Sequence, residues 1–521
     1  LKAAEGSSMA GYLSEDDLPP SDDELSSECG HEEETTGAAA DAFTYRSASL
    51  GVKGGQPYAK FAYAVGSEVL HAEVALPAAI QWESTGEVND CIFHVGLVLL
   101  TWYWMVFALP DVRISAGYLN PEQVAWWESF YCEAFLEYAA VNGLPLECIT
   151  VRISMLAEAP MEERRDVRQQ AMTDTARRML VPLGGGKDSL VAWHLLQERQ
   201  LAGAISSASW LYVADGEGEF EASARLQDIV CQSGADCLVV SVVIDYKAIR
   251  RLMQRFLKPT GHSWAALVAW CSVLAAVAGG FDSIAVGNER SANFGNNVHV
   301  GGKEVNHQFD KSFAFEQSLN HYVYKYIRPG LQYFSALGHL WEVQIAYIFC
   351  KKVNRRYHGA FISCNESRAQ QWCAQCDKCC FVYALLSAWL EVRDVAAIFG
   401  GLDLLADASS LCAFERLIGQ GQAGEVKPFE CVGTADEALL SLSLARQRRL
   451  ASTVGHVDSN HVLPCVLAAL DLSGGTRHSG LLGDHNKENG LPSWWWSRGK
   501  TDGPMAAKLF SDEQWSSATA S

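Results

Sequence analysis

The sequence has no excess of basic residues. It contains 41 Lys and Arg against 61 Asp and Glu, and its net charge at pH 7 is −20. Proteins that hold nucleic acids neutralise the phosphate backbone with Lys and Arg side chains, and binding releases counterions. A chain with the opposite charge balance lacks the means to do this, so we expect no nucleic-acid partner.

Signals for export and for disulfide bonding are lacking as well. Sixteen cysteines are too few for a disulfide scaffold among 521 residues, and no signal peptide is visible. Residues 1–44 hold twelve Asp and Glu but a single Lys, a composition opposite to that of a transit peptide. We expect this acidic head to be disordered, because it has no apolar periodicity.

Long apolar runs are few, and neither of the two longest is typical of a membrane span. Residues 91–109 and 264–281 approach the length that crosses a bilayer. The first contains His94, the second is rich in Ala and Gly, and neither has flanking clusters of Lys or Arg. We predict two core helices and no membrane insertion. We expect a cytoplasmic protein; since the chain opens on Leu1 rather than Met, an organellar (plastid) location stays open.

What the sequence does contain is an alternation of short apolar runs with segments of helical periodicity. It predicts strands at 179–183, 209–215, 237–244 and 283–287, and helices at 189–199, 219–234 and 263–279. Strands that alternate with helices favour an α/β fold with a doubly wound parallel sheet and helices on both faces. Ligands of such sheets bind beyond the carboxyl ends of the strands. Two segments that follow predicted strands, at 184–186 and after 287, are therefore expected to face one site.

Residues 184–189, "GGGKDS", join a predicted strand to a predicted helix. They do not form a Rossmann G-x-G-x-x-G pattern, because Ser189 stands where the last glycine is needed. They do not form a Walker loop either, since Val181 replaces its first glycine and Asp188 follows Lys187. Free backbone N–H groups at the start of a helix can still hold a pyrophosphate, with a hydrogen bond from Ser189 and the charge of Lys187.

One group of cysteines has the spacing of a metal site. The pattern C-x8-C-x2-C-x2-C is formed by Cys364, Cys373, Cys376 and Cys379. Two successive two-residue gaps allow the thiolates to turn back onto a single ion with tetrahedral geometry, and we interpret the group as a structural zinc site. An iron–sulfur site and buried free thiols stay open as alternatives. Cys380 directly follows a ligand and is surplus.

Several motifs resemble known families. The segment "GGGKDS" resembles the SGGxDS signature of the PP-loop ATP pyrophosphatases, and the cysteine spacing is similar to the zinc site of their cyano-deazaguanine synthase branch. Longer motifs between about residues 55 and 470 resemble the UDP-N-acetylmuramoyl-L-alanyl-L-glutamate epimerase family. They are "HVGLVLLTWYW" (94–104), "VGNERSANFGN" (286–296), "KEVNHQFDKSFAFE" (303–316), "WCAQCDKCCFVY" (372–383) and "KPFECVGT" (427–434).

This resemblance implies a PP-loop (HUP-like) fold and an isomerase of peptidoglycan precursor synthesis. The family converts the terminal L-Glu of UDP-MurNAc-L-Ala-L-Glu to D-Glu with ATP and Mg²⁺, through an acyl-adenylate, and releases AMP and pyrophosphate. Joining the carboxylate to AMP neutralises it, so that the α-carbanion can delocalise into a carbonyl whose developing charge fixed donors stabilise. The alternative from the superfamily alone is an ATP-dependent ligase or amidotransferase that adenylates a different carboxylate or a nucleobase.

The resemblance also implies roles for the residues of the glycine loop. The backbone of Gly184, Gly185 and Gly186 and the hydroxyl of Ser189 would hold the pyrophosphate. Lys187 would neutralise charge on the α-phosphate during transfer, and Asp188 would order the loop or reach magnesium. The alternative is an ordinary tight turn.

A second nucleotide-binding segment is expected directly after the strand at 283–287. It comprises Gly287, Asn288, Glu289, Arg290 and Ser291. Arg290 can grip a carboxylate or a phosphate with two hydrogen bonds. In the structural alternative it pairs with Glu289 or Glu304.

Three further residues are candidates for catalysis. His307 and Lys311 lie in "NHQFDKS", and His307 is the first candidate for proton transfer, although a hydrogen-bonded loop histidine is an equal alternative. Cys431 is similar to the cysteines of cofactor-independent amino-acid racemases, in which a thiolate removes an α-proton. A packed turn set by Pro428 and Gly433 is the other interpretation.

The remaining organisation follows from composition. We expect an N-terminal α/β domain at 45–172, an ATP-binding domain with the cysteine site at 173–400 and a small C-terminal segment at 401–470. Residues 471–521 are rich in Gly, Ser and polar residues and are predicted to form a flexible tail. The substrate partner is the UDP-linked muramoyl dipeptide; the oligomeric state stays open.

Overall fold

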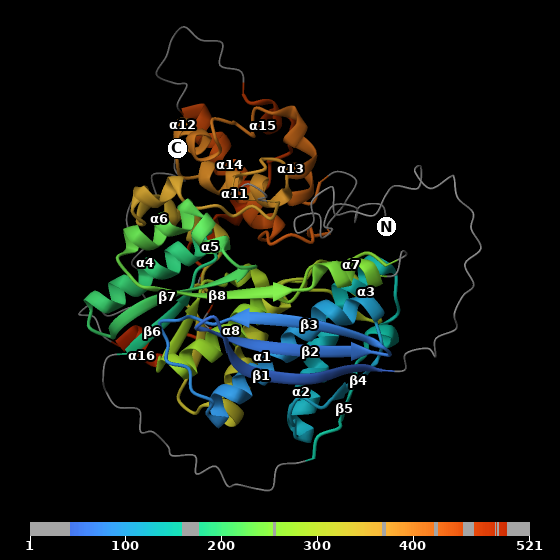
Figure 1. Cartoon of the computed structure of the whole chain (residues 1–521). Helices are drawn as coiled ribbons and strands as arrows, with labels where there is room; N and C mark the ends of the chain where they lie inside the picture. The colour runs from blue at the N-terminus through green and yellow to red at the C-terminus, as the bar shows by residue number, and fades with distance from the viewer. Residues whose placement is uncertain are drawn as a thin grey trace.

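The fold is built around one large sheet flanked by helices (Figure 1). The computed structural model describes residues 42–158, 177–253, 257–366, 371–420, 426–451, 463–484, 486 and 489–497. The predicted disorder of the acidic head concerns residues that, up to 41, lie outside this described part. The same holds for the predicted flexible tail beyond residue 497.

Ten strands form the main sheet, in the order β12-β9-β6-β7-β8-β3-β2-β1-β4-β5. Two further strands, β10 (His299–Val300) and β11 (Lys303–Glu304), form a separate hairpin. The strands of the main sheet are β1 (Phe43–Lys53), β2 (Gln56–Val65), β3 (Glu68–Ala75), β4 (Asp111–Ile114), β5 (Arg152–Met155), β6 (Arg177–Pro182), β7 (Ile205–Asp215), β8 (Cys237–Ile244), β9 (Ser283–Val286) and β12 (Gln332–Ser335).

The parallel sheet predicted from the sequence is confirmed for one half of this sheet. Strands β12, β9, β6, β7 and β8 pair parallel with one another in this order, and β6 to β9 coincide with the four predicted strands. The other half departs from the prediction, because β1, β2 and β3 pair antiparallel and β3 joins β8 antiparallel. The sheet thus continues across the domain boundary expected near residue 172; the division into domains stays a prediction.

Sixteen α-helices accompany the sheet in the described part of the chain. They are α1 (Gly86–Phe107), α2 (Pro121–Ala134), α3 (Leu136–Asn142), α4 (Lys187–Leu201), α5 (Glu219–Ala222), α6 (Ala224–Ser233), α7 (Tyr246–Leu252), α8 (Trp264–Gly279), α9 (Phe313–Tyr322), α10 (Glu342–Lys351), α11 (Asp377–Ser387), α12 (Val392–Ile398), α13 (Leu411–Leu417), α14 (Ala435–Ala451), α15 (Cys465–Ala469) and α16 (Ser493–Ser497). The helix predicted at 219–234 is divided at Ser223, whose hydroxyl accepts from the Leu226 N–H (3.2 Å) and caps α6.

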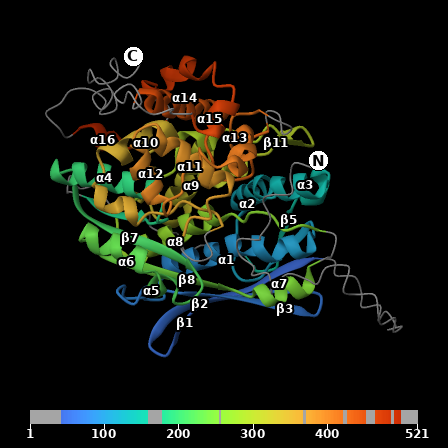
Figure 2. The ribbon, with the colours of Figure 1, turned by 90° about the horizontal axis from the view of Figure 1, so that it is seen from above.

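Helices cover both faces of the parallel half, as the sequence predicts. Successive residues of β6 point to opposite sides: Leu180 packs in the core that contains α1 and α8, and Val181 packs in the core that contains α4, α10 and α11. Such burial on both faces explains why these strands read as continuous apolar runs. Figure 2 shows α11, α13 and α14 gathered near α4 and α10, away from β1–β3.

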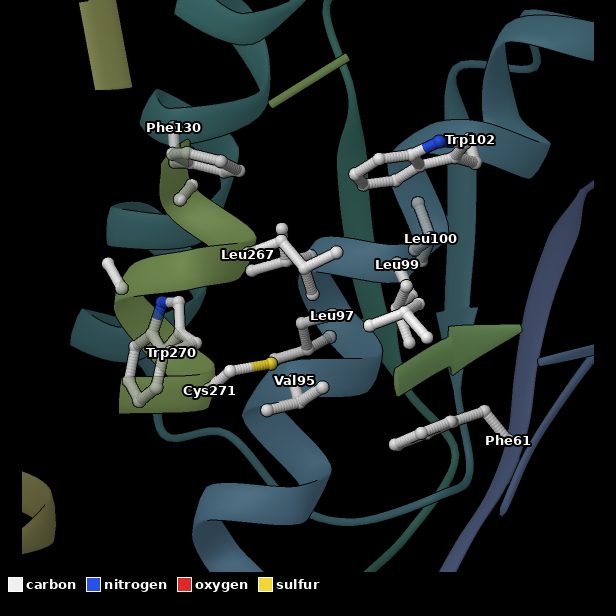
Figure 3. Close-up of a cluster of buried hydrophobic side chains, with 14 of the residues drawn as sticks. Phe61, Val95, Leu97, Leu99, Leu100, Trp102, Phe130, Leu267, Trp270 and Cys271 are labelled. Carbon is white, nitrogen blue, oxygen red and sulfur yellow. The ribbon is translucent and has the colours of Figure 1, made fainter. Parts of the chain in front are cut away.

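The two apolar runs are buried helices. Helix α1 is long and apolar enough to cross a membrane, and 89% of its apolar window is buried inside the fold. It packs against α8, and Leu97 points toward Leu267 and Cys271 of that helix (Figure 3). His94 of α1 is a core histidine, because its ring stacks on Trp270 (4.7 Å between centroids) and its Nε2 lies 2.7 Å from the Tyr322 hydroxyl.

Close packing of α1 on the sheet requires a glycine at position 96. A Cβ added to Gly96 would overlap the Tyr45 hydroxyl and lie 2.7 Å from Cδ1 of Phe61. We expect Gly96→Ala to lower the free energy of unfolding by about 1–3 kcal/mol, the usual cost of overpacking a core. Urea unfolding followed by circular dichroism measures it. Gly86→Ala is the matched control, since a Cβ at the first residue of the same helix meets nothing within 4 Å; an equal loss in both variants would contradict the packing argument.

Candidate functional site

The candidate site lies where three parallel strands of the sheet end. The glycine loop follows β6, the segment from Gly287 to Ser291 follows β9, and Glu342 begins α10 shortly after β12. Among the parallel strands the order is 5-4-1-2-3 in chain sequence, so the direction of winding reverses between β6 and β9. Open α/β sheets bind their ligands at this reversal, beyond the carboxyl ends of the strands.

The glycine loop is short and turns directly into a helix. Helix α4 begins at Lys187, two residues before the predicted start, so Lys187, Asp188 and Ser189 form its first turn. Gly185 has φ +72°, a left-handed conformation that favours glycine. The Ser189 hydroxyl donates to the carbonyl of Gly186 (3.0 Å) and closes the turn.

The two predicted nucleotide-binding segments touch each other. A Cβ on Gly287 would lie 3.0 Å from the carbonyl oxygen of Asp188 and 3.3 Å from the Ser189 nitrogen, so only glycine allows this approach without a shift. The Asn288 carbonyl accepts a hydrogen bond from the Ser335 hydroxyl (2.6 Å) at the end of β12. The structure thus brings the loops after β6, β9 and β12 together at one edge.

A third segment holds the glycine loop from outside. The N–H of Ile362 donates to the Gly185 carbonyl (3.0 Å), and the Ser363 hydroxyl accepts from the N–H of Lys187 (3.4 Å). Arg225 donates to the carbonyls of Gly185 (3.0 Å) and Ala360 (3.2 Å) and links the same two segments. Ile362 and Ser363 directly precede Cys364, the first cysteine of the predicted metal site. The metal site and the glycine loop are therefore joined through these two residues.

Lys187 is fully buried between two carboxylates. Its Nζ lies 2.6 Å from Oδ1 of Asp188 and bonds Oε2 of Glu342, and Lys187 and Glu342 are both 0% exposed. Burial works to lower the pKa of Lys187, but the charges of Asp188 and Glu342 hold it above its usual range. Burial raises the pKa of Glu342 to about 7, against the opposing charge of Lys187. To bind a phosphate, Lys187 would therefore have to break its ion pair with Asp188 or with Glu342.

The charged cluster extends to two further buried residues. Nζ of Lys378, in the first turn of α11, lies 3.7 Å from Oε1 of Glu342. Burial works to raise the pKa of Glu289, but the ammonium groups of Lys311 and Lys378 lower it to about 2. Glu289 is therefore an anion at neutral pH, and its Oε1 accepts from Nε2 of Gln308 (3.0 Å).

Lys311 and Cys431, two predicted catalytic residues 120 positions apart in sequence, are in contact. Nζ of Lys311 lies 3.2 Å from Sγ of Cys431. Burial works to lower the pKa of Lys311, and the charges of Cys431 and Glu289 raise it above its usual range. The ammonium group of Lys311 is therefore placed to donate a hydrogen bond to the sulfur of Cys431.

His307 lies next to this pair, in the hydrogen-bonded loop expected as its alternative. The backbone N–H of His307 donates to Oδ1 of Asn296 (3.0 Å). Nδ2 of Asn296 in turn donates to the carbonyls of Lys427 (3.1 Å) and Pro428 (3.2 Å). Burial, followed by the charges of Lys427 and Lys311, holds the pKa of His307 well below its usual range, although the Glu430 backbone opposes this. The imidazole is neutral at pH 7, and its buried Nε2 has no partner of hydrogen-bond geometry among the described residues.

Arg290 is held by a residue that the sequence analysis did not consider. Its Nη1 lies 2.8 Å from Oδ2 of Asp484, and its guanidinium group sits over the ring of Trp341 (4.3 Å to the centroid). Nε1 of Trp341 donates to the same oxygen of Asp484 (3.2 Å). Asp484 of the C-terminal tail thus packs on the site, and Trp495 of the same tail is 1% exposed.

The four predicted cysteine ligands form one cluster. The sulfurs of Cys364, Cys373, Cys376 and Cys379 all lie within 4.8 Å of one another, so they could hold a metal ion. Two of the separations are 4.0 Å (Cys364 to Cys376) and 3.6 Å (Cys373 to Cys379). Cys380 is not part of the cluster and is fully buried in the core.

Sequence reasoning missed Glu342, Lys378 and Lys427. Glu342 opens a helix of ordinary amphipathic pattern, and nothing in that pattern marks it as charged and buried. Lys378 and Lys427 lie inside the motifs "WCAQCDKCCFVY" and "KPFECVGT". Membership of these motifs could have marked both lysines as candidates. Nζ of Lys427 donates to the carbonyls of Ser291 (3.3 Å) and Phe294 (3.3 Å) and to Oε1 of Gln308 (3.1 Å), which joins it to the Glu289 network.

Comparison with known proteins covers most of the chain. The family model of the MurL N-terminal domain matches residues 34–336, and that of the MurL C-terminal domain matches residues 352–461. A protein of Xanthomonas oryzae pv. oryzae named UDP-N-acetyl-alpha-D-muramoyl-L-alanyl-L-glutamate epimerase is 29% identical over 399 residues, which are 74% of this chain and 82% of that protein.

Two other proteins of the same name give a similar result. The protein of Salinispora tropica is 28% identical over 417 residues, 78% of this chain and 84% of its own length. The protein of a Micromonospora species is 28% identical over 420 residues, 78% of this chain and 87% of its own length. No solved structure matches the chain.

Proposed function

The chain belongs to the MurL family, whose curated relatives are named as epimerases, and we propose that it converts the terminal L-glutamate of UDP-MurNAc-L-Ala-L-Glu to D-glutamate in peptidoglycan precursor synthesis. The observation that carries the proposal is the contact between Lys311 and Cys431, which places a sulfur next to a cluster of fixed charges. Epimerisation needs a base of this kind at the α-carbon.

The proposed reaction consumes ATP. The α-proton next to a free carboxylate is very hard to remove, because its loss places a second negative charge beside the first. Transfer of AMP to the carboxylate neutralises it, gives an acyl-adenylate and releases pyrophosphate; hydrolysis after epimerisation releases AMP. The exposed Gly184 and the N-terminus of α4 would hold the phosphates as a PP-loop, with Asp188 facing Mg²⁺.

In the proton-transfer step, Sγ of Cys431 would take the α-proton, and the ammonium group of Lys311 would hold the sulfur in position. We propose a role for His307 other than the proton transfer expected from the sequence. A neutral imidazole with an unpaired Nε2 is suited to donate a hydrogen bond to the enolate oxygen that develops on the substrate. A proton then returns to the opposite face of the α-carbon and completes the inversion.

The ion that best fits the cysteine cluster is zinc. Zn–S bonds of about 2.3 Å place tetrahedral sulfurs about 3.8 Å apart, and the separations of 4.0 Å (Cys364 to Cys376) and 3.6 Å (Cys373 to Cys379) bracket this value. A cluster with several irons between the sulfurs would hold them further apart. When bound, the ion would fix the segment 360–364 and, through Ile362 and Ser363, the glycine loop.

The activity is tested by incubating the protein with ATP, Mg²⁺ and UDP-MurNAc-L-Ala-L-Glu in deuterated water. We expect AMP, pyrophosphate and D-Glu that carries deuterium at the α-carbon, measured by chromatography and mass spectrometry after chiral derivatisation. UDP-MurNAc-L-Ala-D-Glu offered at the start should exchange its α-proton through the same intermediate. Return of unlabelled L-Glu would refute the epimerase, and AMP formation only with another acceptor would support an ATP-dependent ligase instead.

A proton-transfer role of Cys431 predicts that adenylation and α-proton exchange, the two partial reactions, can be separated. Cys431→Ala should keep ATP-to-AMP turnover, since adenylation does not need the thiol, but should slow α-deuterium exchange by roughly 10²–10⁴-fold, the usual contribution of a positioned base. Cys412→Ala is the control, because Cys412 is an exposed cysteine on a neighbouring helix. Exchange at the wild-type rate in Cys431→Ala would assign proton transfer to another group.

The zinc site predicts one zinc per chain by elemental analysis of the purified protein. Cys373→Ser should lose the zinc and lower the midpoint of thermal unfolding, because the support of the glycine loop is lost with it. Cys465→Ser, at an exposed cysteine outside the cluster, should keep both. Iron and acid-labile sulfide in the purified protein would overturn the assignment.

A further inference from the structure

A cavity of about 420 Å³ lies between the loop that follows β9 and the segment that leads into α14. Its volume falls within the range of small-molecule sites, roughly 300–1,000 Å³. Lys427 and Pro428 line it, yet the proton-transfer residues Lys311, His307 and Cys431 do not. The cavity is therefore next to the candidate site and separate from it.

An aromatic ring forms part of the cavity wall. Phe294 is 44% exposed although it is a large apolar residue. Its ring stacks on Trp341 (5.5 Å between centroids, planes 23° apart), and Trp341 is itself held under the guanidinium group of Arg290. An exposed but rigid ring is a platform for a flat ligand, and stacking of a nucleobase on such a ring contributes about 1–3 kcal/mol.

The same wall offers groups that can recognise the edge of a base. Asn297 and Glu304 line the cavity beside Phe294. The N–H of Asn297 donates to Oε1 of Glu304 (3.2 Å), so the carboxylate is fixed in place. A side-chain amide donates and accepts, and a carboxylate accepts. Together they match the edge of uracil, which presents one N–H between two carbonyl oxygens.

Positive charge reaches the cavity from other elements. Arg416, at the end of α13, uses Nε and Nη2 to bind Asp377 (3.2 and 2.6 Å), and Nη1 is outside this bidentate pair. Thr434 and Ala435 bring the start of the 17-residue helix α14 to the cavity, but its first turn carries Asp436 and Glu437, and Glu437 accepts from the Thr434 N–H (2.8 Å) and caps the helix. Lys427 adds its charge, although its Nζ is bonded to carbonyl and amide oxygens on the inner side.

The cavity and the proton-transfer residues share one turn of the chain. Pro428 and Gly433 line the cavity, and Cys431 between them contacts Lys311. Phe429 of the same turn lies against the ring of His307 (6.1 Å between centroids). A long substrate could therefore have its nucleotide end in the cavity and extend past this turn, so that its reacting carbon lies near Cys431.

We propose that this cavity is the subsite for the uridine diphosphate end of the substrate, with the base on Phe294, its edge read by Asn297 and Glu304, and the diphosphate facing Arg416. The assignment rests on the proposed function, because the curated relatives are named for a UDP-linked substrate. It places the muramoyl dipeptide along the turn 427–434, so that the terminal glutamate reaches Cys431.

Equilibrium binding of UDP alone, measured by isothermal titration calorimetry, tests the subsite. Phe294→Ala should weaken UDP binding about 10-fold or more, which corresponds to the loss of one stacking contact. Tyr324→Ala is the matched control, since Tyr324 is an aromatic residue with 58% exposure that does not line the cavity. ADP serves as the second probe and should bind the glycine loop with an affinity that Phe294→Ala does not change.

Two results would overturn the assignment. One is UDP affinity that is absent or is the same in wild type and Phe294→Ala. The other is an equal loss of ADP affinity, which would mean a general nucleotide site. Catalysis gives an independent reading: Phe294→Ala should raise KM for the UDP-linked substrate and leave turnover of free L-Ala-L-Glu unchanged. Failure of the epimerase assay beside Phe294-dependent UDP binding would refute the proposed function and leave the subsite intact.

Discussion

The structure depends on the pairing of buried charge at the carboxyl edge of the sheet. Lys187 and Glu342 have no exposure to solvent, and their charges are compensated there by each other, with Asp188 and Lys378 as further partners. Removal of one partner from a buried ion pair costs about 3–5 kcal/mol, since the remaining charge stays desolvated. The loop after β6, the start of α10 and the first turn of α11 must therefore meet in one arrangement.

A second set of contacts transmits this arrangement to the reactive groups. Lys378 approaches Glu342 with its ammonium group, which also bonds the Cys431 carbonyl, while its backbone N–H donates to Oε2 of Glu430 (2.8 Å). The turn that carries Cys431 is thus fastened to the first turn of α11, the helix that carries Cys379. Metal ligands, glycine loop and thiol are consequently parts of one framework, in which a shift of any member moves the others.

Much of the fold follows from the sequence, and the part that does not has identifiable physical reasons. Strands β6 to β9 were predictable because burial on both faces makes each a continuous apolar run. Helix α4 begins before its predicted start. The prediction used apolar periodicity, which does not detect a first turn that begins with the polar residues Lys187 and Asp188. The four cysteines were found by their spacing alone. Arg290 pairs with Asp484, 194 positions away, and no local pattern encodes such a partner.

The antiparallel pairing of β3 with β8 has a consequence for the order of events on the ribosome. The hairpins β1–β2 and β2–β3 are local and can form as soon as residue 75 has left the exit tunnel, whereas the partner of β3 is completed only at residue 244. During the synthesis of the intervening chain, the backbone groups of β3 from Ala72 to Ala75 form an open edge, the kind of surface that recruits strands of other molecules. The nascent chain therefore passes through a period in which this edge is unpaired, and the period ends when β8 pairs with β3.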